Sequence, residues 1–334
     1  MKMWVEQVVN RDVMRGMLIA VIGYGSQGRA HAMNLRDSGF DVVVGLRAGG
    51  PSWKQAEADG MAVAAPERAV ESAEIVALLV PDMAQPAVFE SIAPRLRRDS
   101  AILFAHGFNI HYGRIQPPGH CDVILVAPKG PGDLVRRQYE EGRGVPALMA
   151  VHHDASGRAQ ARALAYADGI GGTRGGVLET TFAEETETDL VGEQAVLCGG
   201  VTELVTQGFE TLTEAGYQPE VAYFECMHEL KLIVDLLHEG GLRKMHEFVS
   251  DTARYGDLTR GPRVVDEHTR EQMRKVLDEI RDGTFASEWV NEYDNGMSRY
   301  DAMYRKDLDH PVEKVGRDLR ARMSWLKARK QAAA

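Results

Sequence analysis

The sequence MLIAVIGYGSQG (Met17–Gly28) decides the fold of the first half of the chain. Its apolar, β-branched beginning is typical of a buried strand, and a glycine-rich turn follows directly. Such a turn lets the backbone approach a pyrophosphate, whose charge is stabilised at the N-terminus of the next helix. Glycine-rich turns also have purely structural uses. The candidate dinucleotide-binding residues are Gly23, Tyr24, Gly25, Ser26, Gln27 and Gly28.

Short apolar runs and helical segments alternate after this turn. The predicted strands are residues 17–23, 41–45, 74–80, 100–105 and 122–127, and the predicted helices between them include 27–38 and 52–59. Strands that alternate with helices indicate parallel pairing and a doubly wound α/β sheet. We therefore expect a Rossmann-type domain over residues 1–181.

Long amphipathic helices replace this alternation from residue 182 onward. They are predicted at residues 184–215, 219–238, 240–253, 267–282, 284–294 and 298–308. The pattern predicts an all-α domain over residues 182–327, followed by a tail at 328–334. The segment 315–330 is rich in Arg and Lys, and we assign it no function because terminal basic runs are commonly solvated helix faces.

Composition excludes several classes of protein. The 334 residues are 44% hydrophobic and 26% charged, which is typical of a soluble globular protein. A net charge of −10 argues against nucleic-acid binding. The three cysteines, Cys121, Cys198 and Cys226, are widely spaced, and no signal peptide or membrane-length segment is evident. We expect a cytoplasmic protein that does not bind membranes.

The loop after the second predicted strand carries a cation where NAD-specific domains carry a carboxylate. Gly45–Ser52 reads GLRAGGPS and contains no Asp or Glu to hold the ribose hydroxyls. Arg47 is well placed for a 2′-phosphate, and Ser52 is a second possible partner. The alternative is a solvated loop with an incidental arginine. We predict NADPH as the cofactor, with measurable use of NADH.

Two pairs of acidic residues stand four positions apart in the helical half. Asp189 and Glu193 share one helix face, and Glu225 and Glu229 share another. Their apolar neighbours suggest partial burial, and buried carboxylates need cations. Oxygen ligands without a cysteine set favour Mg²⁺. A solvated helix face is the alternative. His228 lies on a different face and is not a predicted ligand.

Two further polar residues follow predicted strands at their carboxyl ends, where open α/β sheets bind ligands. His106 follows SAILFA, and Lys129 comes shortly after DVILVA. A lone histidine at such a place is also often structural. His152 and His153 have no partner motif and are predicted to lie on the surface.

As a set, several fragments resemble the ketol-acid reductoisomerase family. GYGSQGRAHAMNLRDSG, VGLR, LLVPDMAQ, FAHGFNIHYG and VAPKGPG occur in that order, like its N-terminal motifs. ETETDLVGEQAVLCGG, AYFECMHELKLIVDL, SDTARYGD and FASEWVNE resemble its knotted, all-helical C-terminal domain. The resemblance covers residues 3–325, and the length fits the short class, in which the helical domain is present once.

The resemblance implies roles for individual residues. It implies that Asp189, Glu193, Glu225 and Glu229 hold two Mg²⁺ ions, with Asp189 as the bridging ligand. His106, Lys129 and Glu229 would be catalytic, and Ser250 would contact the substrate. The matching motifs add Asp82, Met83, Ala84, Gln85 and Gly132 to the cofactor-binding set. Short-class members commonly carry serine or another polar residue at the position of Gly50 and often lysine at that of Pro51, so this chain departs from the family there.

The resemblance also implies the reaction and the assembly. Its substrates would be 2-acetolactate and 2-aceto-2-hydroxybutyrate, which undergo Mg²⁺-dependent alkyl migration and reduction to 2,3-dihydroxy acids on the path to valine, leucine and isoleucine. The minimal unit would be a homodimer, with higher oligomers left open. Two other interpretations compete: a metal-free reductase of the β-hydroxyacid dehydrogenase type would not need the acidic pairs, and a non-catalytic dinucleotide sensor would not use His106 or Lys129.

Overall fold

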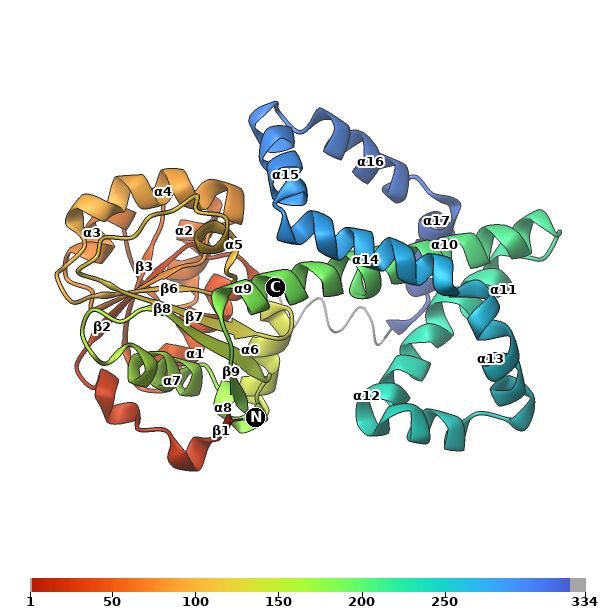
Figure 1. The fold of residues 1–334 in the computed structure, drawn as a ribbon, viewed down its shortest axis with the longest axis horizontal. Coiled ribbons are helices and arrows are strands. Elements are labelled where there is room, and N and C mark those ends of the chain that lie inside the picture. Colours follow the sequence, from red (N-terminus) through yellow and green to blue (C-terminus); the bar gives the residue numbers. More distant parts are fainter. Residues whose placement is uncertain (1, 325–334) are drawn as a thin grey trace. The chain divides into compact units, whose positions relative to one another are not determined.

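The computed structural model of this protein describes residues 2–324 (Figure 1). The chain forms two compact units: the first ends at Thr188 and the second begins at Asp189. The boundary falls inside one helix, α9 (Phe182–Val191). The domain boundary predicted between residues 181 and 182 stays a prediction.

A single sheet of nine strands forms the centre of the described part of the first unit, in the order β1-β9-β8-β7-β6-β5-β2-β3-β4. Strands β2 to β7 are parallel, as predicted. The chain leaves β2 toward β3 on one side and returns to β5 on the other, so the strand order reverses between β2 and β5. Ligands bind at such a reversal in open α/β sheets. The strands are β1 (Met3–Trp4), β2 (Leu18–Ile22), β3 (Asp41–Gly45), β4 (Ala62–Ala64), β5 (Ile75–Leu78), β6 (Ala101–Phe104), β7 (Asp122–Pro128), β8 (Ala147–His153) and β9 (Val177–Glu179).

The edges of this sheet differ from the sequence prediction. β8 pairs with β7 in the antiparallel direction, and β1 pairs with β9 in the same way. Strands β1, β4, β8 and β9 were not predicted. Three of them have two or three residues, which is too short for a periodic pattern to develop.

Helices cover both faces of the sheet (Figure 1). One face packs against α1 and α7 through residues such as Leu35 and Tyr166. The other packs against α3 and α4 through residues such as Val70 and Phe89. The helices of this unit are α1 (Ser26–Asp37), α2 (Pro51–Ala58), α3 (Pro66–Glu71), α4 (Gln85–Ile92), α5 (Phe108–His111), α6 (Gly132–Glu140), α7 (Ala159–Gly169), α8 (Gly172–Gly175) and the beginning of α9, with short 3₁₀ turns η1 (Glu6–Val8), η2 (Arg11–Met14), η3 (Asp82–Ala84) and η4 (Ala93–Arg95).

The described part of the second unit is entirely helical, which confirms the predicted class. Its elements are the π-helical segments η5 (Gly192–Leu197) and η6 (Phe224–His228) and the helices α10 (Gly199–Glu214), α11 (Pro219–Tyr223), α12 (Glu229–Phe248), α13 (Asp251–Val264), α14 (Glu267–Arg281), α15 (Thr284–Asp294), α16 (Ser298–Leu308) and α17 (Pro311–Arg320).

Some helix boundaries that we predicted for this unit from the sequence are wrong. The predicted break at residue 239 is a kink inside α12, where Gly240 and Gly241 leave helical geometry, and the next helix starts only at Asp251. Helix α17 was not predicted. The knot stays a prediction, and the predicted tail at 328–334 lies outside the described residues.

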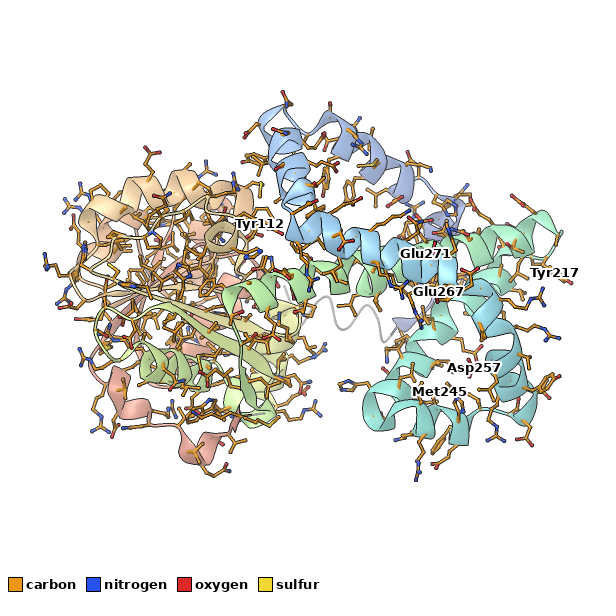
Figure 2. All side chains as sticks on the ribbon, in the orientation of Figure 1. Tyr112, Tyr217, Met245, Asp257, Glu267 and Glu271 are labelled. Atoms are coloured by element: carbon orange, nitrogen blue, oxygen red, sulfur yellow. The ribbon has the colours of Figure 1, made fainter. Side chains whose placement is uncertain are left out.

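In the described part of the second unit, few apolar side chains are buried within a single chain. One core cluster consists of Val205, Phe209, Ala222, Tyr223 and Val312. Helices α12, α13 and α16 bury none of their described residues. Large apolar side chains remain exposed, among them Leu242 and Phe248 at 69% each and Tyr217 at 62%. Tyr217 is labelled in Figure 2. Among the described residues, no helix combines the length and the apolar character needed to span a bilayer.

Candidate functional site

Gly23 and Gly25 lie between β2 and α1, Gly28 lies in the first turn of α1, and each has a different structural reason to be glycine. Gly23 has a φ of 105°, and a Cβ there would lie 2.7 Å from the carbonyl oxygen of Leu79. A Cβ on Gly28 would lie 2.3 Å from the carbonyl oxygen of Gly23. Gly25 instead faces open space, with nothing within 4 Å of a Cβ. The turn is therefore closed by Gly23 and Gly28, and it leaves Gly25 accessible to a pyrophosphate.

The loop before α6 packs directly on this turn. A Cβ on Gly132 would lie 2.2 Å from the carbonyl oxygen of Ser26, so only glycine fits there. The Oγ of Ser26 accepts a hydrogen bond from the Asp133 amide at 3.2 Å, and Gln27 donates to the Gly130 carbonyl at 2.9 Å. Three of the predicted cofactor residues thus hold two loops together at the sheet edge.

Tyr24 points away from the open side of the turn. It is buried, and its hydroxyl donates to Asp59 at 3.0 Å, while Arg29 binds the same carboxylate at 2.7 Å. Burial, together with the charge of Asp59, raises the pKa of Tyr24 above its ordinary value. The side chain therefore stays protonated and connects the glycine turn before α1 to the end of α2.

The predicted residues after β5 form a turn fixed by side-chain amides. Gln85 is buried and donates to the Val80 carbonyl at 3.1 Å and to Asp82 at 3.2 Å. Asn109, which the sequence did not single out, donates to the Asp82 carbonyl and to Gln85, each at 2.9 Å. Within this turn, Met83 is buried and Ala84 is partly buried.

The loop after β3 ends at the N-terminus of α2. Arg47 and Ser52 are exposed, and Ser52 lies in the first turn of the helix, after Gly50 as N-cap. Within the described residues, the Arg47 guanidinium forms no ion pair. A helix N-terminus, a hydroxyl and a guanidinium at one place fit a phosphate group.

A buried carboxylate connects the carboxyl ends of β6 and β7 to α9. Glu185 is 1% exposed, and it accepts hydrogen bonds from the Lys129 ammonium at 2.8 Å and from the Gly107 amide at 3.0 Å. His106 Nδ1 lies 3.2 Å from the same carboxylate. His106 and Lys129 therefore meet at one point, and the residue that joins them was not in the predicted set.

Charge keeps Glu185 ionised despite its burial. Burial alone raises the pKa of this carboxyl, but the hydrogen bond from His106 and the charges of His106 and Lys129 outweigh it and hold the pKa below its ordinary value. The resulting stabilisation is present above the pKa of an unfolded glutamate and is lost as the pH falls through the lower folded value.

Close packing of α9 depends on a glycine. A Cβ on Gly107 would lie 2.3 Å from the Thr186 hydroxyl and 2.9 Å from the Phe182 carbonyl oxygen. Phe182 itself packs edge-on against Phe104, with ring centroids 6.3 Å apart. The first turns of α9 therefore sit directly on the chain that follows β6.

Asp189 lies one turn beyond Glu185 on the same continuous helix. The spacing of four residues places the Glu185 and Asp189 side chains on the same face of α9. Glu185 is already bound by three protein donors, whereas Asp189 is only partly buried. Of these two carboxylates, that of Asp189 therefore fits a hydrated cation such as Mg²⁺.

The other predicted ligands are more exposed than the sequence indicated. Glu193 lies in η5, Glu225 lies in η6 and Glu229 begins α12, and all three are exposed. The expected partial burial of Glu225 and Glu229 is wrong for the single chain, because their neighbours Phe224 and Leu232 are themselves 38% and 50% exposed. Within the described residues, no group of three or more possible metal ligands contains Asp189 together with Glu225 or Glu229.

The remaining predicted residues have local partners or lie on the surface. Ser250 is exposed and caps α13, since its hydroxyl accepts from the Ala253 amide at 3.1 Å. His228 packs edge-on against Phe224. His152 and His153 are exposed, as predicted.

Sequence reasoning missed Glu185, Asn109 and Gly107. A signal for Glu185 was present, because Glu185, Asp189 and Glu193 continue one four-residue spacing. No comparable spacing marks Asn109 or Gly107. Their roles arise from contacts with residues that are distant in the sequence.

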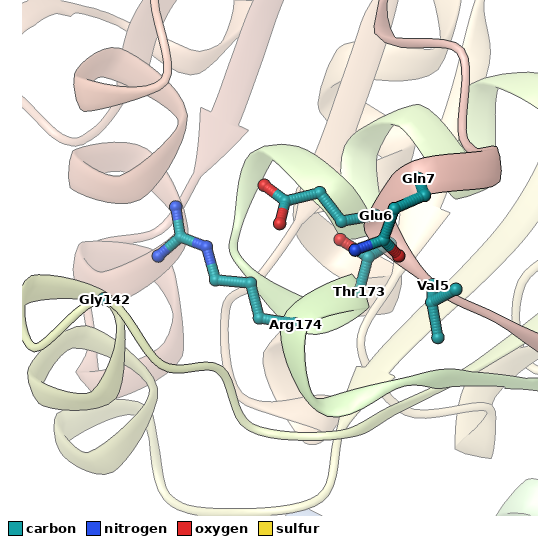
Figure 3. A pocket seen from close by; sticks show the side chains of 6 residues that line it. All are labelled: Val5, Glu6, Gln7, Gly142, Thr173 and Arg174. Carbon is teal, nitrogen blue, oxygen red and sulfur yellow. The ribbon is translucent and has the colours of Figure 1, made fainter.

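A separate hollow in the first unit has a volume of about 620 Å³. It is lined by Val5, Glu6, Gln7, Gly142, Thr173 and Arg174 (Figure 3). It includes none of the predicted site residues, so the candidate site rests on the cluster around Glu185 and the glycine turn.

Comparison with known proteins agrees with this geometry. Residues 13–176 match the model of the acetohydroxy acid isomeroreductase NADPH-binding domain, and residues 182–325 match that of the ketol-acid reductoisomerase C-terminal domain. The chain is 60% identical to a ketol-acid reductoisomerase (NADP(+)) of Xanthomonas euvesicatoria pv. vesicatoria (strain 85-10), with 95% of each protein covered. It is 58% identical to the enzyme of that name from Xylella fastidiosa (strain 9a5c), over 96% of this chain and 92% of that protein.

Solved structures give the same result. An NADH-preferring ketol-acid reductoisomerase from an uncultured archean matches with a TM-score of 0.94 and 46% identity, over 96% of this chain and 99% of that one. A putative oxidoreductase from Jannaschia sp. CCS1 matches with a TM-score of 0.60 at 16% identity, which shows a similar fold alone. The chain therefore belongs to the ketol-acid reductoisomerase family of oxidoreductases, as its sequence motifs predicted.

Proposed function

We propose that this chain isomerises and then reduces 2-acetohydroxy acids, with 2-acetolactate and 2-aceto-2-hydroxybutyrate as substrates, in the synthesis of branched-chain amino acids. The observation that carries the proposal is the meeting of His106 and Lys129 at Glu185, at the sheet edge that also bears the glycine turn, with Asp189 one turn further along the same helix. A metal-free reductase or a non-catalytic sensor would have no use for this combination.

The metal in this proposal is Mg²⁺, held as two ions by Asp189, Glu193, Glu225 and Glu229. All four offer carboxylate oxygens on side chains that are exposed or only partly buried, so water can complete the coordination. The chemistry that Mg²⁺ supplies when bound is Lewis-acid polarisation of the substrate oxygens. Glu229 would act near the substrate as well as hold metal, and Ser250 would contact the substrate carboxylate.

The chain's own residues would orient the substrate and control protons. The Lys129 ammonium points into the cluster, where it can balance negative charge on a bound acid. His106 lies within reach of Glu185, which can fix the ring orientation and stabilise its protonated form. The cluster is mostly shielded from water, with the His106 side chain 19% exposed, and that strengthens each of these interactions.

The cofactor in this proposal is NADPH, which supplies the hydride when bound. Its pyrophosphate would lie over Gly25, where the backbone is open. Arg47, Ser52 and the N-terminus of α2 would hold the 2′-phosphate. The turn from Asp82 to Gln85, fixed by Asn109, would border the remainder of the dinucleotide.

We also propose a homodimer as the minimal unit and the cytoplasm as its location. The second unit leaves large apolar side chains exposed in one chain, and such surfaces are normally covered by a partner. Asp189 and Glu193 would then face the partner subunit's Glu225 and Glu229. The cysteines form no disulfide, which suits a reducing compartment.

Removal of the metal or of Asp189 tests the proposed chemistry. With acetolactate and NADPH, cofactor oxidation should require Mg²⁺, and Asp189→Ala should lower the rate by more than about a hundredfold, because substrate polarisation is lost. NADPH binding, measured by calorimetry, should not change. Glu203→Ala, an exposed carboxylate on α10, is the control. Near-normal turnover by Asp189→Ala, or oxidation without Mg²⁺, would show that the metal assignment is wrong.

The charge of Arg47 should decide the choice of cofactor. We expect the parent to prefer NADPH modestly, because Gly50 and Pro51 offer no side-chain donor to the phosphate. Arg47→Asp should reverse the order, since one charge-assisted hydrogen bond contributes roughly 1.5–3 kcal/mol, or about tenfold or more. The measurement is the ratio of kcat/KM for NADPH and NADH. Arg137→Asp, an exposed cation on α6, should leave the ratio unchanged. A strong preference of the parent for NADH would contradict the prediction.

Subunit mixing tests the shared site. Inactive Asp189→Ala and Glu225→Ala proteins, exchanged into mixed dimers, should regain activity, because one of the two sites in each mixed dimer is intact. Random exchange should restore about a quarter of the parental activity in a twofold-symmetric dimer. Asp189→Ala mixed with Glu193→Ala should stay inactive, since both changes affect the same side. Full activity from a monomer, or no recovery after verified exchange, would exclude the shared site.

A further inference from the structure

The helix that carries the predicted metal ligands changes geometry directly after Asp189. Segment η5 is π-helical, and the Cys198 amide donates across five residues to the Glu193 carbonyl at 3.0 Å. The backbone of Cys198, with φ −112° and ψ −68°, stays in the right-handed helical region but deviates from regular α-helical values. Glu193 therefore lies in a widened turn that holds one more residue than an α-helical turn.

Two consecutive glycines end this widened turn. A Cβ on Gly199 would lie 2.2 Å from the Gln194 carbonyl oxygen, and a Cβ on Gly200 would lie 2.1 Å from the Ala195 carbonyl oxygen. Both obstacles are backbone atoms, so no change of rotamer can relieve the contact. A residue larger than glycine at either position is therefore sterically incompatible with the widened turn.

The clash is specific to these positions and is not a general property of the segment. Gly192, at the beginning of η5, could accept a Cβ, because the nearest atom is the Cδ1 of Leu197 at 3.7 Å. Glycine also lowers helix stability relative to alanine, so two in succession are unfavourable unless the backbone requires them.

The second predicted acidic pair also lies at a π-helical segment. Glu225 lies in the π-helical segment η6, and Glu229 follows it directly. A Cβ on Gly208 of α10 would lie 3.2 Å from Cys226 Sγ in η6, so α10 approaches this segment closely. Widened turns of this kind frequently occur at functional sites.

We propose that Gly199 and Gly200 are positioning residues for Glu193: they permit the widened turn that directs its carboxylate toward the metal. This inference rests on the proposed role of Glu193 as a Mg²⁺ ligand. A side chain at either position forces the turn to tighten, and the loss of one residue from a turn rotates the preceding helix by about 100°. Because Val205 and Phe209 anchor α10 in the core, the rotation acts on Glu193.

Calorimetric titration with Mg²⁺ in the absence of substrate is the direct test. Gly199→Ala and Gly200→Ala should each bind Mg²⁺ at least about tenfold more weakly than the parent, as expected when the support of a ligand is lost. NADPH affinity should not change. Gly192→Ala adds the same methyl group in the same segment and should bind Mg²⁺ like the parent. Parental Mg²⁺ affinity in folded Gly199→Ala and Gly200→Ala would overturn the proposal.

If Gly199→Ala does not fold, a second variant that combines Gly199→Ala with deletion of Ala195 tests the proposal. The deletion removes the extra residue, so the chain can form an ordinary α-helical turn in which the clash is absent. The combined variant should regain cooperative unfolding but still bind Mg²⁺ about tenfold more weakly than the parent. Failure to fold, or parental affinity, would contradict the inference. A parent that binds no Mg²⁺ would instead overturn the proposed metal function, and with it the role of Glu193.

Discussion

The burial of the Glu185 carboxylate is the constraint on which the candidate site depends. A carboxylate that is 1% exposed must be compensated, and Lys129, His106 and the Gly107 amide all converge on it. These donors follow β6 and β7, so the compensation also fixes the beginning of α9 at the carboxyl edge of the sheet. Gly107 permits this approach because it has no side chain.

The carboxylates that follow one another at four-residue spacing through α9 and η5 have different environments. Glu185 is saturated by protein donors, Asp189 is partly buried one turn later, and Glu193 is exposed in the widened turn. A carboxylate with three protein donors gains little from a cation, whereas a partly hydrated one can exchange water for a cation at small cost. The degree of burial therefore distinguishes Glu185, which orients the site, from Asp189 and Glu193, which are proposed to bind Mg²⁺.

The sequence predicted the parallel sheet, the glycine turn and the helical second unit because each has a local periodic or compositional signal. It missed Glu185 and Asn109 because their roles depend on residues far away in the chain. The π-helical segments were not predictable, since they differ from an α-helix by one residue and a few backbone hydrogen bonds. The predicted burial of Glu225 and Glu229 failed because apolar neighbours were assumed to be covered, and in a single chain they are not.

The central claim is that Glu185 positions the site without binding the metal, and the Mg²⁺ affinity of Glu185→Gln tests it most directly. The amide keeps the size of the side chain but loses the charge that holds Lys129 and His106. Loss of such a supporting contact should weaken Mg²⁺ binding by about 10–100-fold. NADPH binding should be kept, and Glu184→Gln, an exposed neighbour on α9, should behave like the parent. Unchanged Mg²⁺ affinity in a folded Glu185→Gln protein would contradict the account.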